Sequence, residues 1–250
     1  MKRTIYFLLF SALASTAFAG DFTICSTGLA TATTSGCGPA INSPLANNLL
    51  PDGNWYVSSN SSGTFQSQAF VTINNSFPVQ NAGPWLGNDA SSAWITPSND
   101  QNGQYINGTS NYFSTQFNLT GPPSLAQISG FWLADDYGSG IFLNGVSVGQ
   151  ASLPAFGGLG GPMVPFNITQ GNPGMGQAFF TPGQNTLTFG VVNDATNHGQ
   201  LNNPATSPTG VRVLFTSATD SVPEPGTMLL MGGGLIGIGL LARRYRTAQA

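Results

Sequence analysis

The amino-acid sequence predicts an all-β protein, built as an antiparallel β-sandwich. Apolar side chains recur with a period of two in short segments, and turn signals rich in Gly, Pro, Asn and Asp separate these segments. No ten-residue window between residues 20 and 222 keeps helical spacing without Gly or Pro. Only 6 % of the residues are charged, but 17 Phe and 4 Trp supply enough apolar surface for a packed core.

Strand candidates in the first half of the chain are short and alternating. The clearest is residues 112–119, which places Phe113, Phe117 and Leu119 on one face and Ser114 on the other. A strand of this kind is half-buried in an antiparallel sheet. The other candidates in this half are residues 54–57, 64–73 and 93–95.

A hairpin is the strongest local signal in the second half. Asn144-Gly145 separates two apolar runs, and Asn-Gly is favoured in a two-residue type I′ turn because both positions require positive φ. We therefore interpret Asn144 as a turn residue rather than a ligand contact. The strand candidates here are residues 127–136, 140–143, 146–148, 163–168, 185–192 and 209–216.

The last of these candidates also predicts which side chains face the core. Alternation places Val211, Val213 and Phe215 inward and leaves Arg212 facing solvent. With Phe113, Phe117, Trp132, Leu143, Leu187 and Phe189 from other candidates, these residues form the expected core.

The N-terminus has the pattern of a secretory signal peptide, residues 1–19. Two basic residues precede an apolar run, residues 5–13, and Ala17-Phe18-Ala19 is an A-x-A cleavage site. The mature chain is expected to begin at Gly20.

The C-terminus predicts a membrane segment, residues 227–242. These sixteen residues carry no charge and would rise about 24 Å as a helix, which is short for a bilayer core of about 30 Å. The basic tail, residues 243–250, contains Arg243, Arg244 and Arg246 and fits a cytoplasmic end, which places the preceding domain, residues 20–221, across the membrane.

Immediately before the membrane segment lies a Pro-Glu-Pro motif, residues 222–226, with Val222, Pro223, Glu224 and Pro225. The prolines cannot continue a helix backward, so the motif is expected to be extended and accessible to a processing enzyme. Motif, Gly-rich apolar helix and arginine cluster together resemble the PEP-CTERM sorting signal, residues 222–250. The resemblance implies processing by exosortase at the inner membrane of a Gram-negative bacterium, then delivery to the cell surface or extracellular matrix.

The composition of the mature domain excludes several classes of function. Between residues 20 and 222 there are eight Asp, no Glu, no Lys and one basic residue, Arg212. Nucleic-acid binding requires clustered Lys or Arg and is not expected. General acids and bases are also scarce, with His198 the one histidine, so we expect no enzyme.

Cys25 and Cys37 are the two cysteines of the chain. In an exported protein, a pair at this spacing is expected to form a disulfide bond, and no neighbouring cysteine or histidine pattern suggests a metal site instead.

A second resemblance covers most of the mature domain. Its hydrophobic and turn patterns are similar to those of secreted PEP-CTERM proteins with a galactose-binding-like jelly roll. The similar segments are residues 94–97, 112–119, 128–135, 141–145, 185–189 and 208–213. The resemblance implies an architecture that serves both sugar-binding modules and inert scaffolds.

Two functions remain open on this evidence. One is a non-catalytic surface or matrix protein associated with exopolysaccharide or biofilm. The other is a carbohydrate-binding module that recognises a surface or matrix glycan, in which aromatic rings would stack on sugars and amides or carboxylates would bind hydroxyls. The candidate ligand-binding residues are Trp85, Asn88, Asp89, Trp94 and Tyr105.

Asp135 and Asp136 are adjacent, so they do not form the opposed carboxylate pair of a glycosidase. They fit a turn, or hard oxygen ligands for a structural Ca²⁺. No other cofactor is expected.

Overall fold

The computed structural model describes most of one compact unit, Gly20–Asp220. A second unit comprises the two ends of the chain, and in it the structure describes one residue, the helical Gly234. The rest of the expected signal peptide and sorting tail lies outside the described residues. The described residues are 22–28, 50–79, 85–89, 91–101, 109–149, 162–170, 179–193, 208–220 and 234.

The described part of the domain consists of β-strands and one short 3-10 helix, which confirms the all-β class. All neighbouring strands pair antiparallel, in the order β7-β6-β9-β4-β1-β2-β3-β10-β5-β8. The elements are β1 (Pro51–Ser58), β2 (Ser67–Val71), β3 (Ile95–Thr96), β4 (Ser110–Leu119), η1 (Pro123–Leu125), β5 (Gln127–Asp135), β6 (Tyr137–Leu143), β7 (Val146–Ser147), β8 (Val164–Thr169), β9 (Gly183–Val192) and β10 (Gly210–Thr219).

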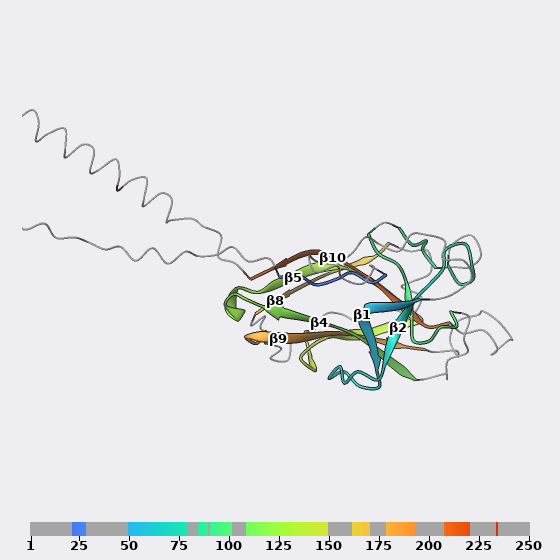
Figure 1. The fold of residues 1–250 in the computed structure, drawn as a ribbon, viewed down its shortest axis with the longest axis horizontal. Helices are drawn as coiled ribbons and strands as arrows, with labels where there is room; N and C mark the ends of the chain where they lie inside the picture. The colour runs from blue at the N-terminus through green and yellow to red at the C-terminus, as the bar shows by residue number, and fades with distance from the viewer. Residues whose placement is uncertain are drawn as a thin grey trace, which may run out of the picture. The chain divides into compact units, whose positions relative to one another are not determined.

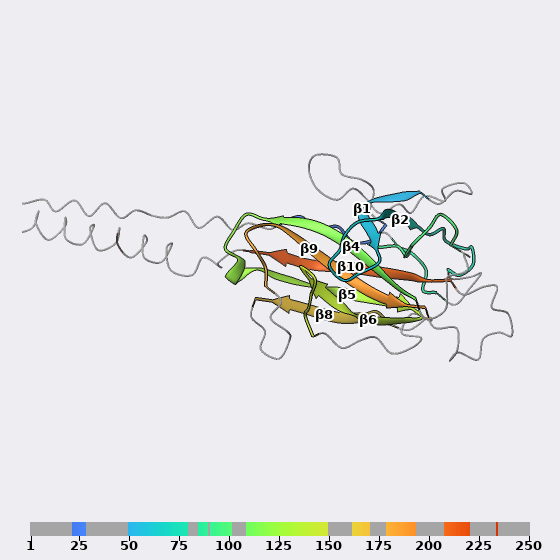
Figure 2. The ribbon, with the colours of Figure 1, turned by 90° about the horizontal axis from the view of Figure 1, so that it is seen from below.

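The sheet is curled into an open half-barrel. One arm consists of β10, β5 and β8, and the other of β4, β9, β6 and β7 (Figures 1 and 2). The described strands do not divide into the two separate sheets of a sandwich, because β1, β2 and β3 connect the arms by hydrogen bonds. The inner faces still meet, since β9 contacts both β10 and β5.

An aromatic cluster fills the space between the arms. The ring of Phe189 from β9 is fully buried and lies 5.3 Å from Trp132 of β5 and 5.8 Å from Trp55 of β1, centroid to centroid. Phe166 of β8 lies 5.6 Å away, and Phe215 of β10 lies 6.5 Å away. Rings from five strands therefore meet at Phe189, and the predicted core is confirmed.

The chain crosses between the arms where β5 ends and β6 begins. A side chain at Gly138 of β6 would collide with the indole ring of Trp132. Glycine at this position therefore lets β6 approach β5 closely. The peptide bonds Phe77–Pro78 and Asp135–Asp136 are both cis.

The predicted hairpin turn is present between β6 and β7. Asn144 has φ of 51° and Gly145 has φ of 83°, as a type I′ turn requires, and Leu143 pairs with Val146. The Asn144 side chain also accepts a hydrogen bond from the Thr186 N–H at 2.9 Å. Asn144 is therefore a structural residue.

Strand β4 follows the predicted alternation with one exception. Phe113, Phe117 and Leu119 are buried. Ser114, expected on the outer face, is also buried. Its hydroxyl bonds to that of Thr188 on β9 at 2.9 Å, and both hydroxyls lie next to Gly63.

The segment before β1 packs against the sheet through buried polar groups. The N–H of Thr27 donates to the Val213 carbonyl at 3.0 Å. The buried carboxylate of Asp52 accepts from the N–H of Gly28 at 2.7 Å and of Asn54 at 2.9 Å. Burial raises the pKa of Asp52 to about 6, against the lowering effect of these backbone hydrogen bonds.

We expect Phe189→Ala to lower the free energy of unfolding by about 3–5 kcal/mol, because it leaves a cavity where five strands meet. Chemical denaturation measures the change. Phe131→Ala is the matched control, since Phe131 is 37 % exposed on β5 and its truncation leaves no enclosed cavity. Equal losses for the two variants would contradict the assignment of the core.

The raised pKa of Asp52 predicts a pH dependence of stability. A group with a raised folded-state pKa stabilises the fold at pH below its unfolded value of 3.8, and that contribution is lost as pH rises through about 6. We expect the difference in unfolding free energy between the wild type and Asp52→Asn to fall by about 2–2.5 kcal/mol from pH 4 to pH 7. Denaturation series at each pH measure it. A difference independent of pH would contradict the prediction.

Candidate functional site

The tryptophans proposed as a sugar-binding platform are buried. Trp85 and Trp94 expose 1 % and 0 % of their surface and stack on each other with centroids 4.3 Å apart. Together with Val79 and Leu133 they form a second, smaller core, separate from the one between the arms. The platform hypothesis at Trp85 and Trp94 is therefore corrected, because their ring faces contact protein.

The polar edges of these two rings are also occupied within the protein. The indole N–H of Trp85 donates to Oδ2 of Asp135 at 2.6 Å, and that of Trp94 donates to the carbonyl of Leu86 at 2.8 Å. Through their packing with Leu133 and the bond of Trp85 to Asp135, both tryptophans hold residues 85–89 and 91–94, the described part of the segment 85–94, against β5.

Asn88 has a structural role in the same segment. Its Oδ1 accepts from the Trp94 N–H at 2.7 Å, and its Nδ2 donates to the carbonyl of Thr72 at 3.1 Å. Of the remaining candidates, Tyr105 lies outside the described residues. The structure thus brings Trp85, Asn88, Asp89 and Trp94 together as a folded unit, but not as an open aromatic surface.

Arg212, expected to face solvent, is 1 % exposed, and this prediction was wrong. It is the register partner of Leu133, so it projects from the outer face of the sheet, which the segment 85–94 covers. Its guanidinium donates to Oγ of Ser92 at 2.8 Å, to the carbonyl of Gly87, and to Oδ2 of Asp89 at 2.6 Å. One cation thus binds three points of the covering segment.

The carboxylate of Asp89 is the exposed end of this arrangement, with 60 % of its side chain accessible. Burial acts to raise its pKa, but the N–H of Ser91 at 2.7 Å and the Arg212 guanidinium act in the opposite direction, and the pKa lies below its usual value. Asp89 therefore remains ionised, as a partner for Arg212.

Asp135 and Asp136 are buried, with 5 % and 8 % of their surface exposed. Asp135 is the last residue of β5 and only Asp136 lies between β5 and β6, and neither residue has the solvent exposure of an ordinary turn. Burial, and then the charge of Asp136, raise the pKa of Asp135 well above its usual value. Within the described residues, no three His, Cys, Asp or Glu side chains are grouped as metal ligands.

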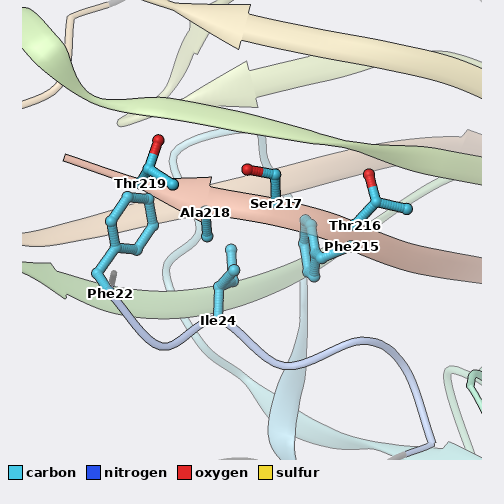
Figure 3. A pocket seen from close by; sticks show the side chains of 7 residues that line it. All are labelled: Phe22, Ile24, Phe215, Thr216, Ser217, Ala218 and Thr219. Atoms are coloured by element: carbon cyan, nitrogen blue, oxygen red, sulfur yellow. The ribbon is translucent and has the colours of Figure 1, made fainter. Parts of the chain in front are cut away.

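An open groove of about 340 Å³ lies along the second half of β10 (Figure 3). Phe22 and Ile24 line one side, and residues 215–219 line the other. The ring of Phe22 stacks on Phe117 with centroids 4.9 Å apart. The lining residues carry no ionisable group, so the groove alone supplies no general acid or base.

Cys25 is buried and disulfide-bonded. Its expected partner, Cys37, lies outside the described residues. The carbonyl of Cys25 accepts from the indole N–H of Trp55 at 2.9 Å, so the cysteine is fixed against β1.

At the other end of the domain, a buried carboxylate holds the end of β10. Oδ2 of Asp220 accepts from the N–H of Thr120 at 2.9 Å and from that of Gly121. A side chain at Gly121 would collide with Asp220. Beyond Asp220, the expected motif and the arginines at 243, 244 and 246 lie outside the described residues. Over the part of the chain that is described, no helix has the length and hydrophobicity to cross a bilayer.

These features define an acidic all-β domain followed by a separate C-terminal segment. A family model of the PEP-CTERM protein-sorting motif matches residues 221–246. The match indicates an exported protein whose C-terminal segment is held in the membrane and processed by exosortase. No curated protein and no solved structure matches the chain.

Sequence reasoning missed Arg212 as an organising residue. The available signal was its isolation, since it is the one basic residue between positions 20 and 222. A single cation within an apolar strand adds little to solubility, so a buried role as a hydrogen-bond donor explains it better.

We expect Arg212→Lys to lower the free energy of unfolding by about 2–3 kcal/mol, because one ammonium cannot reach the three acceptors and remains buried. Asp89→Asn should cost about 1 kcal/mol or less, since its carboxylate is largely exposed. Chemical denaturation measures both, and limited proteolysis should cut Arg212→Lys faster within residues 85–94. Equal losses of unfolding free energy for Arg212→Lys and Asp89→Asn would contradict the prediction.

Proposed function

We propose that this chain is a non-catalytic protein of the cell surface or extracellular matrix, delivered by exosortase and associated with exopolysaccharide. The observation that carries the proposal is the sorting-motif match at residues 221–246, which begins directly after the last residue of the folded domain, Asp220. An export signal at residues 1–19 and a membrane segment at residues 227–242 complete the proposed route.

The chemistry of the described residues supports a role without catalysis. Their one cation, Arg212, is buried and bound to Asp89. Asp52 and Asp135, whose pKa values are raised, are buried in the fold and bonded to backbone N–H groups and to Trp85. The open groove contains no ionisable side chain. These side chains fit a structural or adhesive role better than acid–base catalysis.

The alternative of a carbohydrate-binding module used Trp85, Trp94 and Tyr105 as its aromatic residues. The rings of Trp85 and Trp94 are buried and stacked on each other, which removes them as a sugar-stacking surface, and Tyr105 lies outside the described residues. We therefore propose that the protein is located together with polysaccharide, and we assign no sugar-binding site to it.

The way the domain ends is compatible with processing of a folded protein. The carboxylate of Asp220 binds the N–H groups of Thr120 and Gly121, which lie between β4 and η1. These bonds lie within Gly20–Asp220 and do not use the tail. Removal of residues beyond the motif should therefore leave the sheet intact.

We expect the double variant Pro223→Ala, Pro225→Ala to fold and be exported but to remain unprocessed in the inner membrane. The reason is the sequence-based expectation that prolines on both sides keep Glu224 in an extended peptide that a processing enzyme can bind. Fractionation followed by immunoblotting against the domain, in a strain that contains exosortase, measures the size and location of the product. Deletion of residues 227–250 should instead release an unprocessed domain into the periplasm.

Ser221→Ala is the matched control, because it lies beside the motif and leaves Pro-Glu-Pro unchanged. It should be processed as the wild type is, and the wild type in a strain without exosortase should behave as the double variant does. Normal size and location for the double variant would show that the motif is incidental and that the tail is only an anchor.

A further inference from the structure

Strand β10 is paired along the whole of one edge but only along part of the other. β5 pairs with β10 from one end to the other. On the opposite edge, among the described residues, β3 pairs with β10 only at Val211, and the N–H of Thr27 donates to the carbonyl of Val213 at 3.0 Å. Residues 215–219 of β10 therefore have a strand neighbour on one side only.

The segment that runs beside this edge separates from β10 toward its N-terminal end. Oγ of Ser26, rather than a main-chain oxygen, accepts from the N–H of Phe215 at 3.0 Å. Among the described residues, no main-chain hydrogen bond joins Phe22 or Ile24 to β10. The groove of about 340 Å³ opens at this point, with these two residues on one side and β10 on the other (Figure 3).

The main chain of β10 presents a donor and an acceptor to the groove. In an antiparallel pair, opposite residues alternate between groups that bond to the paired strand and groups that point away from it. Val213 is the register partner of Trp132, and its N–H and carbonyl bond to Thr27, on the side away from β5. Ala218 is the register partner of Ile128, four residues from Trp132, so its N–H and carbonyl point to the same side. No described segment bonds to them there.

The side chains of the groove suit an extended chain. Four lining residues belong to the core or pack against it: Phe22, Ile24, Phe215 and Ala218. Thr216 and Ser217 line the groove at exposed positions. Side chains of a strand alternate between its two faces. A strand in the groove would therefore place every second side chain against the apolar residues and the others toward solvent.

Charge restricts the kind of chain that the groove accepts. No lining residue is ionisable. Residues 20–222 contain eight Asp and one Arg, a net of seven negative charges, and Arg212 is already bound to Asp89. The field of the domain therefore repels an acidic peptide and attracts one with basic ends.

We propose that the free edge of β10 at residues 215–219 binds an extended segment of a partner protein as an added β-strand. The partner segment has apolar residues at alternate positions and no acidic residue. Its main chain bonds to Ala218, and its apolar side chains contact the groove, so hydrogen bonds supply affinity and the apolar contacts supply preference. Five residues of a strand extend about 14 Å between the first and last Cα, so a partner segment of similar length fills the site.

The pairing of Thr27 with Val213 is the precedent for this binding within the chain itself. It shows that the same edge of β10 already accepts an extended main chain at its previous free position. The partner strand continues that pairing toward Thr219. Such a site gives a non-catalytic surface protein a means to hold another protein, and it does not depend on processing by exosortase.

Fluorescence polarisation tests the site on the full chain, purified in detergent. The probe is a labelled octapeptide of alternating Thr and Val with a Lys at each end. We expect saturable binding. The same peptide with N-methyl groups on all six central residues keeps its side chains but lacks the main-chain donors, so it should bind at least about tenfold more weakly. Replacing the terminal Lys residues by Glu should also weaken binding, most strongly at low salt.

A substitution in the groove tests the location. Ser217→Glu places a charge at an exposed position of the lining and should weaken binding of the octapeptide at least about tenfold, with an unchanged thermal midpoint of unfolding. Gln68→Glu is the matched control, because it adds the same charge at an exposed position of β2 outside the groove. It should bind the octapeptide as the wild type does.

Three results would overturn this assignment. Absence of saturable binding at about 1 mM peptide would exclude a peptide site of useful affinity. Equal affinity for the N-methylated and unmodified peptides would exclude strand addition, and equal affinity in Ser217→Glu and the wild type would exclude the groove. Self-association of the wild type that Ser217→Glu abolishes, measured by light scattering, would show that a second copy occupies the groove instead of a partner protein.

Discussion

The contact of Phe189 with aromatic rings from four other strands is the interaction on which the fold depends. β9 and β10 are not hydrogen-bonded to each other, so nothing in the ladder holds the arms of the half-barrel face to face. The rings of Trp55, Trp132, Phe166 and Phe215 do so, by burying apolar surface between the arms. The curvature of the sheet then follows from β1, β2 and β3, which join the arms along one side.

Scarcity of charge shapes the rest of the domain. With Arg212 as the one Lys or Arg between positions 20 and 222, surface ion pairs of Lys or Arg with carboxylates cannot organise the loops. Buried or partly buried side chains bonded to backbone do this instead. The buried Asp52 holds the segment before β1, the buried Asp220 holds the end of β10, and the partly buried Asn88 accepts from the backbone N–H of Trp94. The guanidinium of Arg212 is buried and donates hydrogen bonds to three acceptors inside the protein. A fold assembled in this way should be little affected by salt at its surface.

The sequence was sufficient for features that depend on local periodicity. Alternation located the strands and their core faces, and positive φ at Asn144 and Gly145 followed from the Asn-Gly dipeptide. It failed where burial comes from a segment distant in the chain. Nothing local distinguishes a strand face open to solvent from one covered by residues 85–94, so Arg212 was predicted outside and Trp85 was treated as a surface ring. The same limit explains the prediction of a sandwich. Alternation shows which face of a strand is buried, but it does not show whether the two layers around the core belong to one sheet or to two.

The division between domain and tail has a physical basis in the end of β10. The strand ends at Thr219, the carboxylate of Asp220 binds two backbone N–H groups near η1, and the sorting-motif match starts at residue 221. The last bonds of the domain are thus formed one residue before the signal that exosortase reads. The hydrogen bonds that hold the end of β10 join residues within Gly20–Asp220, and the sorting-motif match covers residues 221–246. Among the described residues, the bonds that end the sheet and the residues of the sorting match are therefore separate stretches of the chain.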